Sequence, residues 1–289
     1  MPVMGRNVST DDLIRELEAG GVLGGTPGAP PVKSGAAPSG LSRSGAVAEP
    51  AGRTSGLVFF LVAAVLVAVV GALPFGSLAL YPFSLFVTLI HESSHALAGV
   101  ITGGSVQKLG LNSDLSGVTD IRGGAMALIA PAGYLGATLA GVALLLTPLR
   151  YARRALGVLA AVPLAALVFF HPASLFTAVW CAIFAAALGA AAWKLRPRMA
   201  AFLQVFLGVA AGLNAFRDLI NLIFISGSSS HIQTDADNMS RALFLPPLFW
   251  AYLWAVLSVA LLLMACIALF RRDFPSLRPP RRQQRGGRV

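Results

Sequence analysis

One five-residue motif in the sequence combines residue types that can hold a metal ion and move a proton. It reads His91-Glu92-Ser93-Ser94-His95. In a helix the two histidines stand one turn apart on one face, so both imidazoles can reach the same ion. Zinc accepts neutral histidine nitrogens at about 2.0–2.1 Å and prefers four ligands. We therefore predict zinc ligands at His91 and His95, and a catalytic acid/base at Glu92, next to a water on the metal.

The motif lies inside a long apolar segment, which favours a functional interpretation. Ionisable side chains are costly inside a bilayer and usually mark function there. The simpler alternative is a pair of histidines that hydrogen-bond between helices, with the glutamate as a partner. Two further histidines, His171 and His231, fall in connections between apolar segments. We expect them in loops or near lipid headgroups rather than on the metal.

A catalytic zinc site needs a third protein ligand and an open position for water. Asn214, Asp218 and Asn221 follow helical spacing and form one polar stripe on an apolar segment. In lipid that stripe must face the interior of the bundle, so Asp218 is the favoured third ligand. Asp235 competes for the role. Its simpler interpretation is a helix N-cap in a surface loop.

The composition places the chain in a membrane. Of its 289 residues, 56% are hydrophobic and 12% are charged, against about 25% charged in soluble domains. The mean hydropathy is +0.75. The net charge of +10 comes from Lys and Arg in short gaps between apolar segments and in the C-terminal tail. That distribution suits contact with lipid headgroups, so we predict a lipid bilayer as partner and no nucleic acid.

The apolar segments predict an all-α membrane protein, a polytopic helical bundle of about six to seven transmembrane helices. Prolines mark the expected breaks, Pro82 among them. Residues 103–123 alternate apolar and polar around glycines, which indicates a hairpin or a re-entrant strand. We expect a disordered N-terminal tail over 1–55, a membrane domain over 56–270 and a basic tail over 271–289. The candidate spans are 57–80, 82–102, 124–147, 155–171, 173–194, 200–225 and 247–270.

The charges also predict an orientation. With seven spans, the positive-inside rule places the C-terminus in the cytoplasm and the N-terminus outside. A polar tail of this length without a signal sequence fits the cytoplasm better. The two arguments disagree about the N-terminus, and we favour a cytoplasmic C-terminus.

The sequence resembles the site-2 protease family of intramembrane zinc metallopeptidases, in its short bacterial and plant branch. The family usually turns its zinc helix towards the cytoplasm and often takes its third ligand from a Leu-Asp-Gly motif. Here Asp218 is followed by Leu219. The resemblance implies zinc, an Asp third ligand and hydrolysis of a membrane-embedded peptide bond. It rests on residues 89–98, 102–104, 116–119 and 132–136, and less closely on 213–219 and 234–236.

These observations predict an intramembrane zinc metalloprotease. Its substrate would be a membrane protein, cut in or near a transmembrane segment and paired with residues 103–123 in an extended form. We expect a multi-pass protein of the plasma membrane of a bacterium. The alternatives are a non-catalytic membrane scaffold or regulator with a relic zinc site, and a transporter that uses the polar stripe as an ion path. A transporter often shows repeated broken helices, which this sequence lacks.

Overall fold

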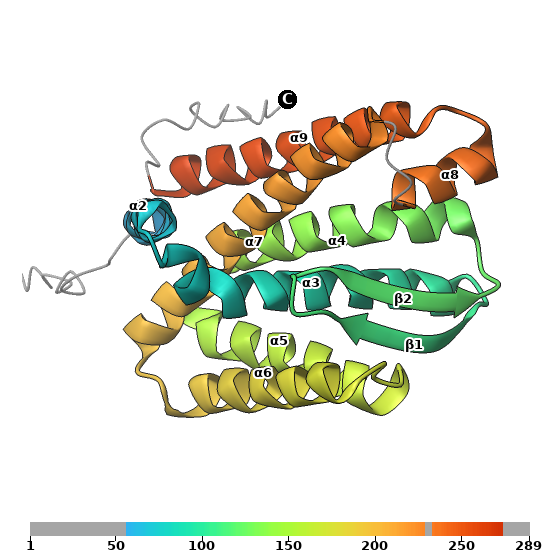
Figure 1. Ribbon diagram of the computed structural model, residues 1–289. Helices are drawn as coiled ribbons and strands as arrows, with labels where there is room; N and C mark the ends of the chain where they lie inside the picture. The colour runs from blue at the N-terminus through green and yellow to red at the C-terminus, as the bar shows by residue number, and fades with distance from the viewer. Residues whose placement is uncertain (1–55, 229–232, 274–289) are drawn as a thin grey trace, which may run out of the picture. The chain divides into compact units, whose positions relative to one another are not determined.

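The computed structural model describes residues 56–228 and 233–273, which form helices and one two-stranded hairpin (Figure 1). The expected tail at 1–55, most of the basic tail at 271–289 and His231 lie outside the described residues. In chain order the elements are α2 (Gly56–Ala72), α3 (Gly76–Ile101), β1 (Ser105–Leu111), β2 (Gly117–Arg122), α4 (Met126–Leu146), the 3-10 turn η1 (Leu149–Tyr151), α5 (Ala152–Phe169), α6 (Leu175–Lys194), α7 (Pro197–Ser226), α8 (Asp235–Leu243) and α9 (Pro247–Asp273).

Six of the described helices are long and apolar enough to cross a membrane: α3, α4, α5 with η1, α6, α7 and α9. Helix α2 has 17 residues, so it is about 25 Å long and shorter than the hydrocarbon core of about 30 Å. Large apolar side chains are exposed along these helices, as lipid contact requires. The prediction of an all-α bundle of about six to seven spans is confirmed.

The break predicted at Pro82 is wrong, because α3 continues through it. Proline removes one backbone hydrogen bond, and helices packed in a membrane tolerate that loss when neighbouring groups satisfy the freed carbonyl. The chain breaks earlier, in the turn that contains Pro74. Helix α3 therefore begins before the candidate span that was predicted from residue 82, and it carries the whole histidine motif.

The segment 103–123 forms an antiparallel hairpin, which is one of the two forms expected for it. Leu111 pairs with Gly117 next to the turn. It lies along α3 (Figure 1) and contacts that helix through both strands. Tyr81 donates a hydrogen bond to the Ser113 carbonyl over 2.9 Å. Thr88 donates to the Leu115 carbonyl, also over 2.9 Å. These bonds fix the turn of the hairpin against the helix that carries the histidines.

The two edges of the hairpin differ. On the outer edge of β1, the backbone N–H of Leu109 donates to the His171 carbonyl at 3.2 Å, and the N–H of Ala173 donates to the Leu109 carbonyl at 2.7 Å. The loop after α5 therefore covers β1. Within the described residues, β2 pairs with β1 and with no other strand. The open edge of the hairpin is thus β2.

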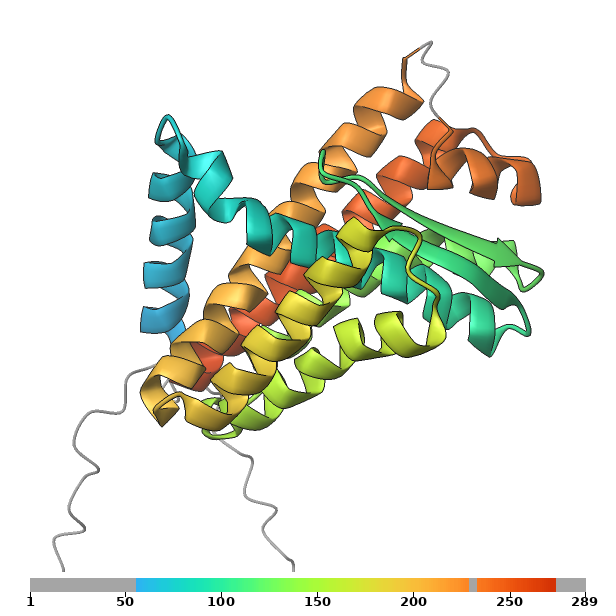
Figure 2. The same ribbon diagram turned by 60° about the horizontal axis from the view of Figure 1, so that its bottom comes forward.

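The two ends of the described chain lie at the same end of the bundle. The ring of Phe59, early in α2, contacts that of Phe202, early in α7, with centroids 5.8 Å apart. Figure 2 shows the start of α2 beside the start of α7. At the other terminus, Arg272 donates a hydrogen bond to the Leu146 carbonyl, at the end of α4. Seven separate crossings would instead place these ends on opposite sides.

Positive charge collects at this same end of the bundle. The helix ends and turns there carry Arg150, Arg153, Arg154, Lys194, Arg196, Arg198, Arg271 and Arg272. The opposite end, with the base of the hairpin and α8, carries Lys108, Arg122 and Arg241. The arrangement removes the conflict between the charge rule and the long N-terminal tail, because both arguments now favour a cytoplasmic position for both ends.

We therefore predict that the basic end faces the cytoplasm. Single cysteines at Tyr151 (basic end) and Ser228 (opposite end), in a background with Cys181 and Cys266 replaced by alanine, test this with a membrane-impermeant maleimide. In intact cells Ser228→Cys should react and Tyr151→Cys should react only after lysis. The reverse pattern would support the cytoplasmic zinc helix that the family resemblance implies.

Candidate metal centre

The two histidines of the motif converge, as their spacing predicts. They lie on α3, and their Nε2 atoms are 3.0 Å apart. His95 Nδ1 lies 2.7 Å from the Ile129 carbonyl oxygen. A carbonyl only accepts, so Nδ1 carries the proton and Nε2 presents a lone pair. A backbone acceptor behind a histidine is the usual device that orients a metal ligand.

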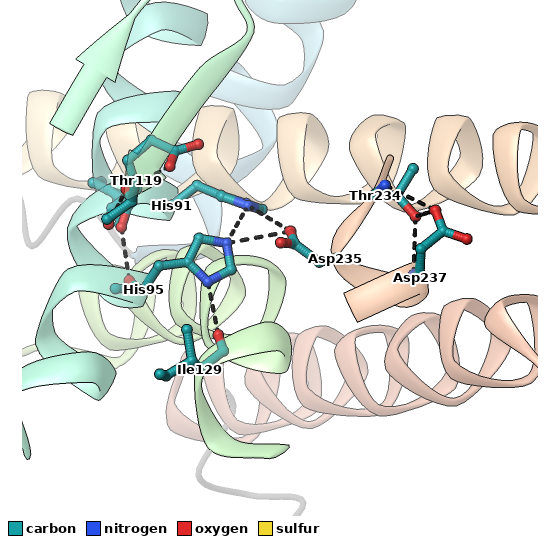
Figure 3. A network of polar contacts seen from close by, with 10 residues as sticks. His91, His95, Thr119, Ile129, Thr234, Asp235 and Asp237 are labelled. Carbon is teal, nitrogen blue, oxygen red and sulfur yellow. Dashed lines mark hydrogen bonds and ion pairs between the residues drawn. The ribbon is translucent and has the colours of Figure 1, made fainter. Parts of the chain in front are cut away.

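The carboxylate that meets these imidazoles belongs to Asp235 (Figure 3). Its Oδ2 lies 3.5 Å from His91 Nε2 and 3.2 Å from His95 Nε2. Ligands at zinc distances in a tetrahedron are about 3.3 Å apart, which agrees with all three separations. In the part of the chain that the structure describes, these three residues form the group able to share one ion. The donor set therefore fits zinc, with one tetrahedral position left over.

Asp235 reaches this point because of how α8 begins. Thr234 is the N-cap: its hydroxyl accepts a hydrogen bond from the Asp237 N–H, and the Asp237 carboxylate accepts one from the Thr234 N–H at 2.8 Å. This capping box occupies Asp237 and leaves Asp235, the first residue of the helix, free to point at the histidines (Figure 3). The Thr-x-x-Asp spacing in the sequence could have signalled this helix start.

Burial alone raises the pKa of Asp235, but the imidazoles of His95 and His91 outweigh it and hold that pKa below its ordinary value. A zinc ligand must be ionised, and a bound zinc ion would supply the positive charge in place of protonated imidazoles.

Asp218, the favoured third ligand from the sequence, is not in the group. It lines the same cavity and interacts electrostatically with His91. Asn221 also lines the cavity, whereas Asn214 donates to the Ala210 carbonyl of its own helix. The inward-facing stripe was predicted correctly for Asp218, but the carboxylate nearest the imidazoles comes from the loop after α7. The geometry of the described residues therefore favours Asp235 over Asp218 as the candidate third ligand.

Glu92 is held by the hairpin. It is 6% exposed, and its Oε2 lies 2.6 Å from the Thr119 hydroxyl, which donates the hydrogen bond. Gly117, where β2 begins, packs so closely on the Glu92 carboxylate that a Cβ there would collide with it. Sequence reasoning assigned no role to Thr119. Its contact with Glu92 depends on how the hairpin folds back on α3.

Gly133 brings α4 against the histidines. A Cβ at this position would collide with the Nε2 atoms of both His91 and His95. The next residue, Tyr134, places its ring edge-to-face on His91, with centroids 4.6 Å apart. The cluster lies in a cavity of about 620 Å³. Its lining includes both histidines, Glu92, Tyr134, Asp218, Asp235 and residues 115–121 of the hairpin.

The fold and the site together define an integral multi-pass membrane protein with two histidines and a carboxylate gathered between its helices. A family model described as Peptidase M50B-like matches residues 57–265. The chain therefore belongs to this peptidase family, and the resemblance to the site-2 proteases is confirmed. Comparisons with curated proteins and with solved structures gave no match.

The ligand assignment predicts which substitutions remove metal. His91→Ala, His95→Ala and Asp235→Ala should each lower the zinc content of the purified protein by tenfold or more, because each removes one of the three donors. Asp218→Ala is the matched control and should keep zinc near the wild-type level. Metal analysis at fixed free zinc measures both. Loss of zinc in Asp218→Ala with retention in Asp235→Ala would return the role to α7.

The close approach of α4 predicts a second effect on metal binding. Gly133→Ala adds one methyl group against both imidazoles, so zinc affinity should fall about 10–100-fold while the helical content is unchanged. Gly189→Ala on α6 has open space for its methyl group and serves as the control. Chelator competition and circular dichroism measure the two quantities. Wild-type affinity in Gly133→Ala would show that the imidazoles do not occupy this position.

Proposed function

We propose that the protein is an intramembrane zinc metallopeptidase that hydrolyses a peptide bond in or near a transmembrane segment of a membrane protein. The observation that carries the proposal is the convergence of His91, His95 and Asp235 at zinc-compatible distances, inside a cavity that Glu92 also lines. Membership of a peptidase family supports it. The membrane we expect is the plasma membrane of a bacterium, as the sequence resemblance implies.

The side chains divide the chemistry between them. A bound zinc ion supplies Lewis-acid activation of a water molecule and of the scissile carbonyl. Glu92 takes the proton of the attacking water and returns it to the leaving amine. The hydroxyl of Thr119 donates to Glu92 Oε2 and so fixes the orientation of the carboxylate. Thr119 thus orients the base, and the Ile129 carbonyl orients His95.

The hairpin offers a way to present the substrate. A transmembrane helix hides its carbonyl groups in its own hydrogen bonds, so the substrate must be extended where it is cut. Residues of β2 line the cavity, and the outer edge of this strand has no strand partner among the described residues. An extended substrate segment can add to that edge through backbone hydrogen bonds and pass beside Glu92.

The rival from another class is a non-catalytic scaffold or regulator with a relic zinc site. It shares every metal-binding expectation with the enzyme, so zinc content does not separate the two. Glu92 separates the two proposals, because a scaffold does not need this base for its function and a peptidase loses its turnover without it. An ion-transport role through Asp218 would likewise leave proteolysis absent.

The enzyme proposal predicts that Glu92→Gln keeps zinc and loses activity. The amide keeps the shape of the side chain and removes the base, and such groups typically contribute about 10²–10⁴-fold. The assay co-reconstitutes the full chain in liposomes with a library of single-span membrane substrates and follows cleavage by mass spectrometry.

Cleavage by the wild type should depend on Glu92 and stop with a zinc chelator. Asp120→Asn, a change to another acidic side chain on the cavity wall, controls for loss of negative charge alone. Undiminished cleavage in Glu92→Gln would contradict the mechanism. A zinc-loaded wild type that cuts nothing across the library would favour the scaffold.

A further inference from the structure

Tyr134 occupies a position at the candidate site that the proposed chemistry has not used. Its ring stands at 87° to that of His91, edge-to-face, and also stacks on Trp254 with centroids 5.7 Å apart. A ring in contact with two others has little freedom to turn away. Tyr134 also lines the cavity that contains the histidines and Glu92. Helix α4 therefore presents a phenol at a fixed place beside the cluster.

The hydroxyl of this phenol has no hydrogen-bond partner among the described residues. Buried tyrosine hydroxyls usually find a partner. The Tyr134 phenol instead interacts electrostatically with Asp235, Asp218 and Glu92, which places it among the acidic groups around the histidines. An unpaired donor that faces a cavity is available to a molecule that enters it.

Several other donors on the cavity wall are already engaged. The Thr119 hydroxyl donates to Glu92, and that of Thr88 lies within hydrogen-bond distance of two backbone carbonyls. The Thr234 hydroxyl contacts Asp237, and the Gln233 amide donates to Asn238. The carboxylates accept and do not donate when ionised. A neutral donor would add to the stabilisation that a bound metal gives to negative charge on a substrate, and Tyr134 places such a donor beside His91.

We propose that the Tyr134 hydroxyl donates a hydrogen bond to the scissile carbonyl oxygen as that oxygen becomes an oxyanion. The proposal rests on the peptidase function proposed above and adds a catalytic residue to it. A preorganised donor at a developing oxyanion stabilises the transition state more than the ground state. The hydroxyl, rather than the ring, is thus the part of Tyr134 that turnover requires.

Tyr134→Phe isolates that part, because phenylalanine keeps both ring contacts and removes only the donor. Zinc content should equal that of the wild type, KM should change little, and kcat should fall about 10²–10³-fold, as for other lost oxyanion donors. Tyr252→Phe on α9, an exposed tyrosine outside the cavity lining, is the matched control and should leave kcat unchanged. Single-turnover cleavage of the best substrate from the liposome library measures these rates.

A second measurement does not depend on turnover. A phosphinic peptide with the substrate sequence mimics the tetrahedral oxyanion, and its affinity should fall in Tyr134→Phe. The affinity of the uncleaved substrate, measured in a Glu92→Gln background, should not change when Tyr134→Phe is added. Equal phosphinate affinity and equal kcat in wild type and Tyr134→Phe would overturn the proposal and leave Tyr134 with a packing role. Loss of zinc in Tyr134→Phe would also overturn it, because the residue would then act through His91. Failure of the peptidase proposal is read separately, from cleavage that does not depend on Glu92.

Discussion

The close contact of α4 with the histidine pair of α3 is the constraint on which the site depends. Gly133 permits it, since any side chain there would occupy the positions of the two Nε2 atoms. The same contact brings the Ile129 carbonyl to His95 Nδ1 and the Tyr134 ring to His91. One missing Cβ therefore allows a single helix to set the tautomer of His95, pack against His91 and line the cavity. A bulkier residue at this position would move α4 away from α3 and break these contacts.

The membrane setting explains why the polar groups are so closely tied to one another. Ionisable side chains in an apolar bundle are costly unless they are paired or bind a metal. Here Asp235 on α8 pairs with the histidines on α3, and the Thr119 hydroxyl donates a hydrogen bond to Glu92. Each of these partners comes from a segment outside the helix that it serves. The hairpin is equally constrained, because the loop after α5 covers one edge and leaves the other facing the cavity.

The position of the cluster relative to the charges bears on access. Asp235 begins the short helix that follows α7, at the end of the bundle opposite the arginine-rich turns. The cavity that Asp235 lines thus lies away from the basic turns. The side of the membrane on which this end lies decides which half of a substrate segment can be cut. The charge rule and the family resemblance give opposite answers for that side.

The sequence by itself determined the local features. Apolar length and low charge specified a helical membrane bundle, and the i, i+4 spacing placed His91 and His95 on one face with Glu92 beside them, because helix geometry alone sets those relations. The alternation over 103–123 allowed the hairpin. The candidate third donor follows from the fold: Asp218 and Asp235 are both acids of suitable type, and which one meets the histidines depends on where the chain turns after α7 and how Thr234 caps α8. Thr119, Gly133 and Tyr134 likewise take their roles from contacts between segments distant in sequence, which no local pattern encodes.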